Sequence, residues 1–299
     1  MWVSISQVRM LVMSVHAGVT FALIALFGWA LGDFFIQKST RAMGWYKALF
    51  LIGIAGFVGL APFALQQLPT KEMLLPLGIL SLIVFGYAWA LFEALRVGKI
   101  SVVESVVAIE LPFTVSLSIF IGGERLTSLQ GILFLVVCAG IVLAATKQFD
   151  HFKRGKHWFE KGVLLAFFGS FLSALTNFYI GSFSHTMSPL VVIWVTHSLL
   201  ALLCGIYITA KGEWREFKRD VRENKFTSLG TAVFDNAAWV GYAFATSMIP
   251  TSLVVTMSES YIALAAFLGW IFGHERMRWH QVAGALIAFV GVFFLSATL

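Results

Sequence analysis

Charged side chains are scarce in this chain of 299 residues. Asp, Glu, Lys and Arg together make up 12% of the sequence, against roughly 25% in a typical globular protein. Hydrophobic residues make up 59%. A chain with so little charge cannot cover an ordinary globular core with polar surface, so the composition indicates a membrane protein.

Sequence motifs that usually carry soluble-enzyme chemistry are also missing. The two cysteines, Cys138 and Cys204, lie among apolar neighbours with no second ligand at metal spacing, so we expect small core residues. No Gly-Lys-Ser phosphate loop and no Ser-His-Asp signature occurs in the sequence. We therefore expect no catalysis, no metal and no cofactor, and leave coupling to protons open.

Long apolar stretches are abundant. A hydrocarbon core about 30 Å thick needs roughly 17 to 25 helical residues, and ten stretches are long enough. They are continuous, without the alternation of barrel strands, and so predict an all-α membrane protein. The ten predicted spans are 15–36, 45–65, 73–95, 101–121, 128–146, 162–184, 188–210, 227–247, 252–272 and 279–297.

One short sequence motif, or phrase, occurs twice, at 122–131 and at 273–284. Glu124-Arg125 returns as Glu275-Arg276, 151 residues later, and the same shift places Ser101 on Ser252 and Gln130 on Gln281. Five predicted spans separate the two copies, and an odd number puts them on opposite membrane faces. The sequence thus predicts two inverted five-helix repeats, at 1–146 and 162–299, joined by a basic linker at 147–161.

The phrase itself has the features of a turn between helices. Its glycines suit a helix end, and Thr127 with Gln130 has the spacing of a capping box for the following helix. Glu124 is then expected to complement the amino end of the span at 128–146. The alternative is a gate in which the two loops close opposite sides in turn.

These residues resemble a known family. Gly-Lys-Ile-Ser at 98–101, Leu-Pro at 111–112, Gly-Glu-Arg-Leu at 123–126 and Gln-Gly at 130–131 are similar to the EamA-type repeat of the drug/metabolite transporter superfamily. The resemblance implies ten helices and the export of amino acids or other small metabolites. The second copy has Ala263 where the first has Pro112, so we expect only one of the two equivalent spans to bend.

Acidic residues within predicted spans are candidates for a functional site, because each is costly to insert. The repeat shift places Glu259 one helical turn from the position of Glu104, which predicts that both carboxylates face one centre. The alternative is that both are stabilised by the starts of their helices. Glu110 faces elsewhere and needs a partner, either Lys47 or a bound proton.

Other polar residues give further candidates. Asp33 and Asn177 occupy matching positions in the front halves of the repeats, under a shift of 144, which suggests a shared lining. Interfacial placement is the alternative for Asp33, and a cap is the alternative for Asp235. His197 is expected to be a packed histidine, with a proton relay as the alternative.

Two tryptophans lie well inside predicted spans. Trp89 and Trp239 are candidate aromatic walls for an organic ligand or cation, although packing or lipid contact is the simpler interpretation. Gly53, Gly56 and Gly59 have the small-residue spacing that lets helices approach closely.

The net charge of +6 does not indicate nucleic-acid binding, because the basic residues lie in short loops between spans. On the predicted topology, 18 of the 21 Lys and Arg residues lie on the face opposite the amino terminus. The positive-inside rule then places both termini outside the cytoplasm. The family resemblance implies cytoplasmic termini instead.

The sequence therefore predicts a secondary transporter of a small organic solute, such as an amino acid or amine, working by alternating access. We expect it in the inner membrane of a bacterial or archaeal cell, surrounded by lipid and functional as a monomer. The alternative is a membrane-embedded enzyme or flippase acting on a lipid or lipid-linked substrate.

Overall fold

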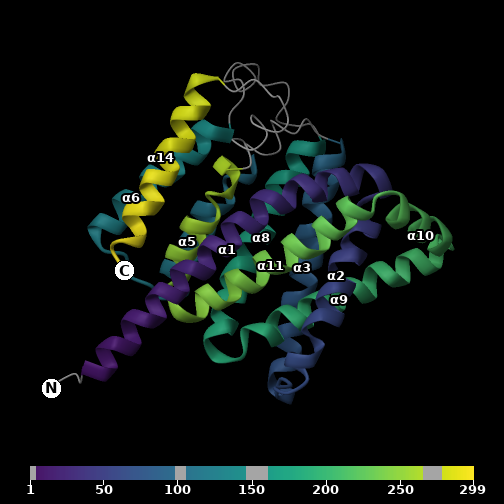
Figure 1. The fold of residues 1–299 in the computed structure, drawn as a ribbon, viewed down its shortest axis with the longest axis horizontal. Helices are drawn as coiled ribbons and strands as arrows, with labels where there is room; N and C mark the ends of the chain where they lie inside the picture. The colour runs from purple at the N-terminus through teal and green to yellow at the C-terminus, as the bar shows by residue number, and fades with distance from the viewer. Residues whose placement is uncertain (1–4, 98–105, 146–160, 265–277) are drawn as a thin grey trace.

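The computed structural model describes residues 5–97, 106–145, 161–264 and 278–299. All regular structure in these ranges is helical, without a strand (Figure 1). The helices are α1 Ile5–Met43, α2 Trp45–Ala64, α3 Lys71–Val97, α5 Glu110–Phe120, α6 Ser128–Ala145, α8 Lys161–Thr186, α9 Pro189–Lys211, α10 Trp214–Glu223, α11 Lys225–Met248, α12 Thr251–Ser258 and α14 Trp279–Ser296.

Seven of the described helices are long and apolar enough to cross a membrane: α1, α2, α3, α6, α8, α9 and α14. The chain is an integral, multi-pass membrane protein. The predicted span at 227–247 corresponds to α11. The predicted spans at 101–121 and 252–272 extend beyond the described residues, so the total of ten stays a prediction.

Two helices are interrupted at equivalent positions. In the first half the helix breaks at 108–109 and α5 begins at Glu110; in the second, α12 ends at Ser258 and the break lies at 259–260. The repeat shift of 151 residues superimposes these two breaks. The expectation that only the copy with Pro112 would bend is therefore wrong.

Each break has its own cause. Pro112 has no N–H, and its ring crowds the carbonyl of the residue four positions earlier, which is Ala108. In the second copy, hydroxyls bond to carbonyls one turn back: Thr256 Oγ1 donates to Ser252 O at 2.6 Å and Ser260 Oγ to Thr256 O at 3.2 Å. Such back-bonding bends helices without proline.

Close helix approach at glycines positions α2 against α9 and α11. A Cβ on Gly53 would lie 2.6 Å from the backbone nitrogen of Ala201, and one on Gly56 would lie 2.4 Å from Asn236 Oδ1. The predicted packing role is confirmed for these two glycines. It is wrong for Gly59, where a Cβ would meet nothing within 4 Å.

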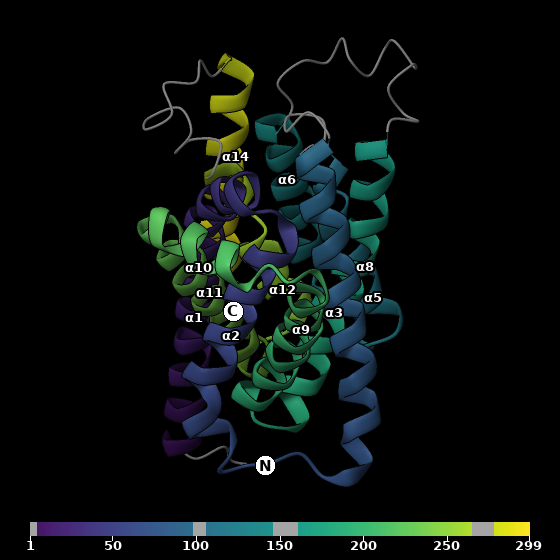
Figure 2. The same cartoon turned by 90° about the vertical axis from the view of Figure 1, so that its right-hand side faces the viewer.

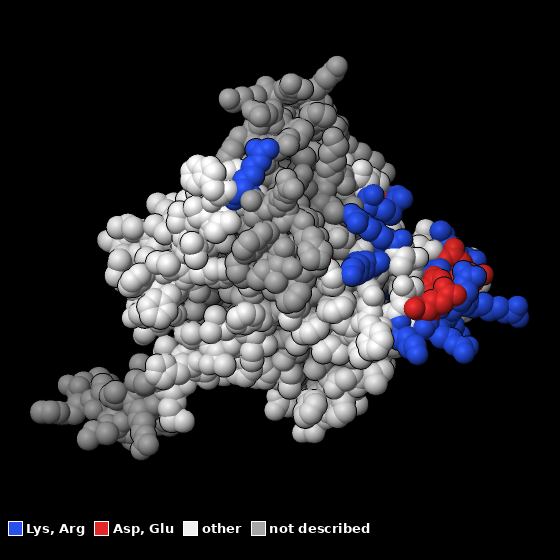
Figure 3. All heavy atoms as spheres, turned by 45° about the horizontal axis from the view of Figure 1, so that its top comes forward, with Lys and Arg blue, Asp and Glu red and all other residues white. Residues whose placement is uncertain are grey.

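Helix α10 was not expected, since the sequence indicated only a basic loop there. Its apolar side rests on Phe50 of α2, with ring centroids 5.2 Å from Trp214 and 5.3 Å from Phe217. Figure 3 shows charged side chains of both signs gathered at the side of the molecule where α10 lies. Helix α10 is therefore an amphipathic helix between two apolar ones.

Candidate functional site

Two buried carboxylates and one amide form the centre of the candidate site. Glu110 opens α5, Glu259 follows the last residue of α12, and Asn177 lies on α8; their exposed fractions are 4%, 3% and 1%. Asn177 Nδ2 donates to Glu110 Oε1 at 2.6 Å and lies 3.5 Å from Glu259 Oε1. One amide group thus joins acids from the two halves of the chain.

Glu110 has a second hydrogen-bond donor from the same helix. Ser173 Oγ, one turn before Asn177, donates to Glu110 Oε1 at 2.7 Å. Lys47 is not its partner, which corrects one of the two alternatives left by the sequence. Lys47 Nζ instead pairs with Asp220 at 3.0 Å and Glu213 at 3.3 Å.

A helix break explains why Glu110 tolerates burial. Glu110 lies in the first turn of α5, where unpaired N–H groups and the helix dipole favour a carboxylate. Glu259 has no such support, because it lies at the carboxyl end of α12. Asn177 Nδ2, 3.5 Å away, is the hydrogen-bond donor that approaches Glu259 instead.

Asp33 adds a third acid. The carboxylate of Asp33, on α1, interacts electrostatically with both Glu110 and Glu259. The two residues paired by the sequence, Asp33 and Asn177, thus both belong to the neighbourhood of one carboxylate pair.

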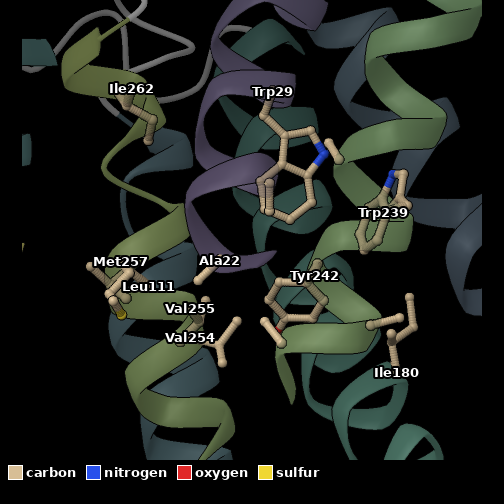
Figure 4. Packing of buried hydrophobic residues seen from close by; sticks show 14 of the residues in the cluster. Ala22, Trp29, Leu111, Ile180, Trp239, Tyr242, Val254, Val255, Met257 and Ile262 are labelled. Carbon is tan, nitrogen blue, oxygen red and sulfur yellow. The ribbon is translucent and has the colours of Figure 1, made fainter. Parts of the chain in front are cut away.

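The rings of Trp29, Trp239 and Tyr242 lie together in the buried hydrophobic core (Figure 4). The ring of Trp29, on α1, lies 5.1 Å from Trp239, 5.6 Å from Tyr242 and 5.9 Å from Tyr261. Tyr87 of α3 lies 6.0 Å from Trp239. The rings come from distant parts of the chain and form one aromatic cluster.

The aromatic cluster is tied to the acid centre. The hydroxyl of Tyr242 donates to the backbone oxygen of Asn177 at 3.1 Å. Trp89, by contrast, is 37% exposed and is not among the rings of this cluster. Sequence reasoning missed Trp29 and Tyr242, although Trp29 precedes Asp33 by one helical turn and so shares its face.

The remaining candidates lie elsewhere. His197 of α9 and Asp235 of α11 approach each other, with Nε2 and Oδ2 3.9 Å apart. Glu104 lies outside the described residues. Glu93 of α3, which is 7% exposed, bonds Arg96 through two contacts of 2.6 Å.

The first copy of the repeated motif, at 122–131, forms the turn that its sequence predicted, with one correction. Gly123 has φ of 71° after α5, and Thr127 and Gln130 exchange capping-box bonds of 3.0 and 3.2 Å. Glu124, however, does not serve the helix that follows it. Its two oxygens accept the backbone N–H groups of Thr251 and Ser252, at 2.8 and 2.9 Å, at the start of α12 in the other half.

Metal binding finds no support in the described part of the chain, where no group of three His, Cys, Asp or Glu side chains could hold an ion. The site's chemistry is that of acids, an amide and aromatic faces.

Comparisons with known proteins bear on the identity of this fold. The family model described as EamA-like transporter family matches residues 16–146 and again 160–297. One solved crystal structure shares 15% sequence identity, covers 94% of this chain and 98% of its own, and superimposes with a TM-score of 0.69. No curated protein matches the sequence. With both halves matched, the chain belongs to the EamA-like transporter family.

Proposed function

We propose that this protein is a secondary transporter of a small organic solute bearing a cationic amino group, an amine or an amino acid. The observation that carries the proposal is the centre formed by Glu110, Asn177 and Glu259. Buried acids are expensive in a membrane and are retained for ion or solute binding.

The hydrogen-bonding capacity of the centre supports a donor-rich solute. Asn177 Oδ1 is buried and has no hydrogen-bond partner among the described residues, and a carboxylate only accepts hydrogen bonds. An ammonium group has three N–H donors to offer to Asn177 Oδ1 and the two carboxylates. The faces of Trp29 and Tyr242, part of the adjoining aromatic cluster, add cation–π attraction.

The paired breaks support alternating access between two inverted repeats of five helices. Discontinuous helices that meet at a solute site are typical of transporters built from such repeats. Glu124 adds a contact between the halves that a rocking motion would break and remake. Because one chain supplies both acids, we propose a functional monomer. We also propose that it works as an exporter in a bacterial or archaeal inner membrane.

The test is flux into proteoliposomes of labelled amino acids, amines and organic anions, measured with and without a pH gradient. We expect saturable flux of amino-group solutes, with Glu110→Gln and Glu259→Gln each reducing the rate at least tenfold. Glu72→Gln, an exposed acid at the start of α3, is the matched control.

Two outcomes would contradict the proposal. Preferential flux of organic anions would exclude the cationic solute class. An absence of flux for every class, from folded protein, would exclude a solute transporter and favour an enzyme or flippase acting on lipid.

A further inference from the structure

A second buried polar cluster lies between α2, α9 and α11. Its central residue is His197, with an exposed fraction of 2%. The ring nitrogen Nδ1 lies 2.9 Å from the backbone oxygen of Ile193. A carbonyl only accepts hydrogen bonds, so Nδ1 carries the proton and Nε2 of the neutral ring carries a lone pair.

The Nε2 atom is an acceptor without a donor. It is buried and has no hydrogen-bond partner among the residues that the structure describes. Asp235 Oδ2 lies 3.9 Å from it, and a carboxylate is likewise an acceptor. A lone pair and a carboxylate that face each other in this way lack one hydrogen between them.

Asn236 adds a third acceptor. Its Nδ2 donates to Ile52 O at 3.1 Å and to Ala232 O at 2.8 Å, which fixes Oδ1 on the other side of the amide. Oδ1 is buried and unpartnered within the described ranges. It and the ring of His197 lie against the same point of α2, because a Cβ on Gly56 would be 2.4 Å from Oδ1 and 2.8 Å from His197 Cδ2.

The charged groups on neighbouring helices do not supply the missing hydrogen. On α2, Lys47 is engaged with Glu213 and Asp220, and Tyr46 donates to Glu213. On α3, Tyr87 interacts electrostatically with Asp235. The other charged and polar groups on these helices have partners elsewhere: Asp33 of α1 interacts with Glu110, Arg96 of α3 bonds Glu93, and Ser173 and Asn177 of α8 donate to Glu110.

We infer that His197 and Asp235 form a proton-binding site separate from the carboxylate pair of Glu110 and Glu259. A proton that binds Nε2 converts the imidazole to imidazolium, whose new N–H donates to Asp235. The 3.9 Å separation then closes to roughly 2.7 to 2.9 Å, the length of a charge-assisted hydrogen bond. One proton binds and no other bond changes.

The consequence for transport rests on the proposed function. Closing the contact draws α9 towards α11 at a point where Gly56 lets α2 pack against both. Proton binding at His197 would therefore alter helix packing away from the solute. Release of that proton on the opposite side of the membrane is the step by which an imposed pH gradient would drive flux.

Binding is tested first, without any solute. The full-length protein is labelled with ¹⁵N-histidine, reconstituted in lipid nanodiscs and followed by NMR from pH 9 to pH 5. We expect one signal to show the Nδ1–H tautomer at high pH and imidazolium at low pH. His197→Asn, whose amide keeps the donor to Ile193, should remove this signal, whereas the exposed His185→Asn should leave it.

The partner is tested in the same way. Asp235→Asn keeps the size of the side chain and removes its charge, so proton binding at His197 should weaken about tenfold. A His197 signal that remains neutral at pH 5 in the parent protein would overturn the site. An unchanged titration in Asp235→Asn would overturn the pairing.

Flux then separates this inference from the proposed function. We expect stimulation by a pH gradient to be lost in His197→Asn and in Asp235→Asn and retained in His185→Asn. Gradient-stimulated flux that survives in folded His197→Asn overturns the inference and leaves the transporter standing. A normal His197 titration in a protein without solute flux overturns the transporter and leaves the proton site standing.

Discussion

Glu124 of the first half of the chain caps a helix of the second half. Its carboxylate accepts the N–H groups of Thr251 and Ser252, which are orphan donors at the start of α12. Loss of a capping side chain typically costs about 0.5–2 kcal/mol. We therefore expect Glu124→Ala to lower the free energy of unfolding by about 1–2 kcal/mol, measured by denaturant titration in detergent.

Arg125→Ala is the control for this prediction, because it lies in the same turn and has an exposed side chain. Glu124→Gln should fall between the two, since an amide keeps one acceptor oxygen of the original two. Equal stabilities for Glu124→Ala and Arg125→Ala would show that the contact between the halves contributes nothing to the fold.

Local residue contacts were predictable from the sequence and long-range ones were not. The capping box joins Thr127 to Gln130, three residues apart, so spacing alone identified it. The partners of Glu124 lie 127 and 128 residues away, and no spacing rule reaches that far. The donors to Glu110 are equally out of reach of a spacing rule, because Ser173 and Asn177 lie 63 and 67 residues away. The sequence offered Lys47 as a partner instead.

At the scale of elements, glycine spacing decides how closely α2 approaches α9. A Cβ at Gly53 would lie 2.6 Å from a backbone nitrogen of α9, and backbone cannot move aside as a side chain can. We expect Gly53→Ala to destabilise the protein by about 1–3 kcal/mol, the usual effect of overpacking. Thermal unfolding of the purified protein measures it.

Gly59→Ala is the matched control on the same helix. Its Cβ would meet nothing within 4 Å, and alanine is a better helix former than glycine by about 0.5–1 kcal/mol. Its stability should therefore equal or exceed that of the parent protein. A destabilised Gly59→Ala would mean that the close approach of α2 to its neighbours extends further than the structure places it.

Two elements were missed by the sequence predictions, each for its own physical reason. The break at 259–260 contains no proline or glycine that would mark it in the sequence. Hydroxyl back-bonding by residues such as Thr256 bends the helix there instead. Helix α10 was hidden by its charge, and its signal was the pair Trp214 and Phe217, three residues apart on one face. The long apolar helices were predictable because burial in lipid demands unbroken hydrophobic runs.

At the scale of the whole molecule, ionic contacts hold α10 against the bundle. Tyr46 donates a hydrogen bond to Glu213, and together with Lys47 this contact holds the pKa of Glu213 below its ordinary value of 4.5. A carboxylate with a lowered folded-state pKa stabilises the fold above the unfolded-state value, and the effect is lost as pH falls through the folded-state value.

The difference in melting temperature between the parent protein and Glu213→Gln should therefore be largest near neutral pH and shrink below about pH 4.5. Glu216→Gln, on the same helix, controls for a general effect of charge. A difference that stays constant from pH 7 to pH 4 would show that Glu213 acts by packing, without any contribution from its charge.

Orientation in the membrane follows from the distribution of charge over the whole chain. Figure 2 shows the start of α1 and the α2–α3 connection at one end of the bundle, and the start of α14 at the other. On the predicted topology the amino-terminal face carries three basic residues, Arg9, Lys71 and Arg125, and the opposite face carries the remaining 18 of 21. Short loops with so large an excess of Lys and Arg stay in the cytoplasm.

We therefore predict that the amino terminus faces away from the cytoplasm, against the orientation that the family resemblance implied. A tag at the amino terminus should be accessible to an impermeant reagent in intact cells, and a tag in the 147–161 linker should become accessible only after the membrane is opened. The reverse pattern would overturn the charge argument. It would also place α10 and its basic side chains outside the cell, where positive charge would have to be retained for a reason other than topology.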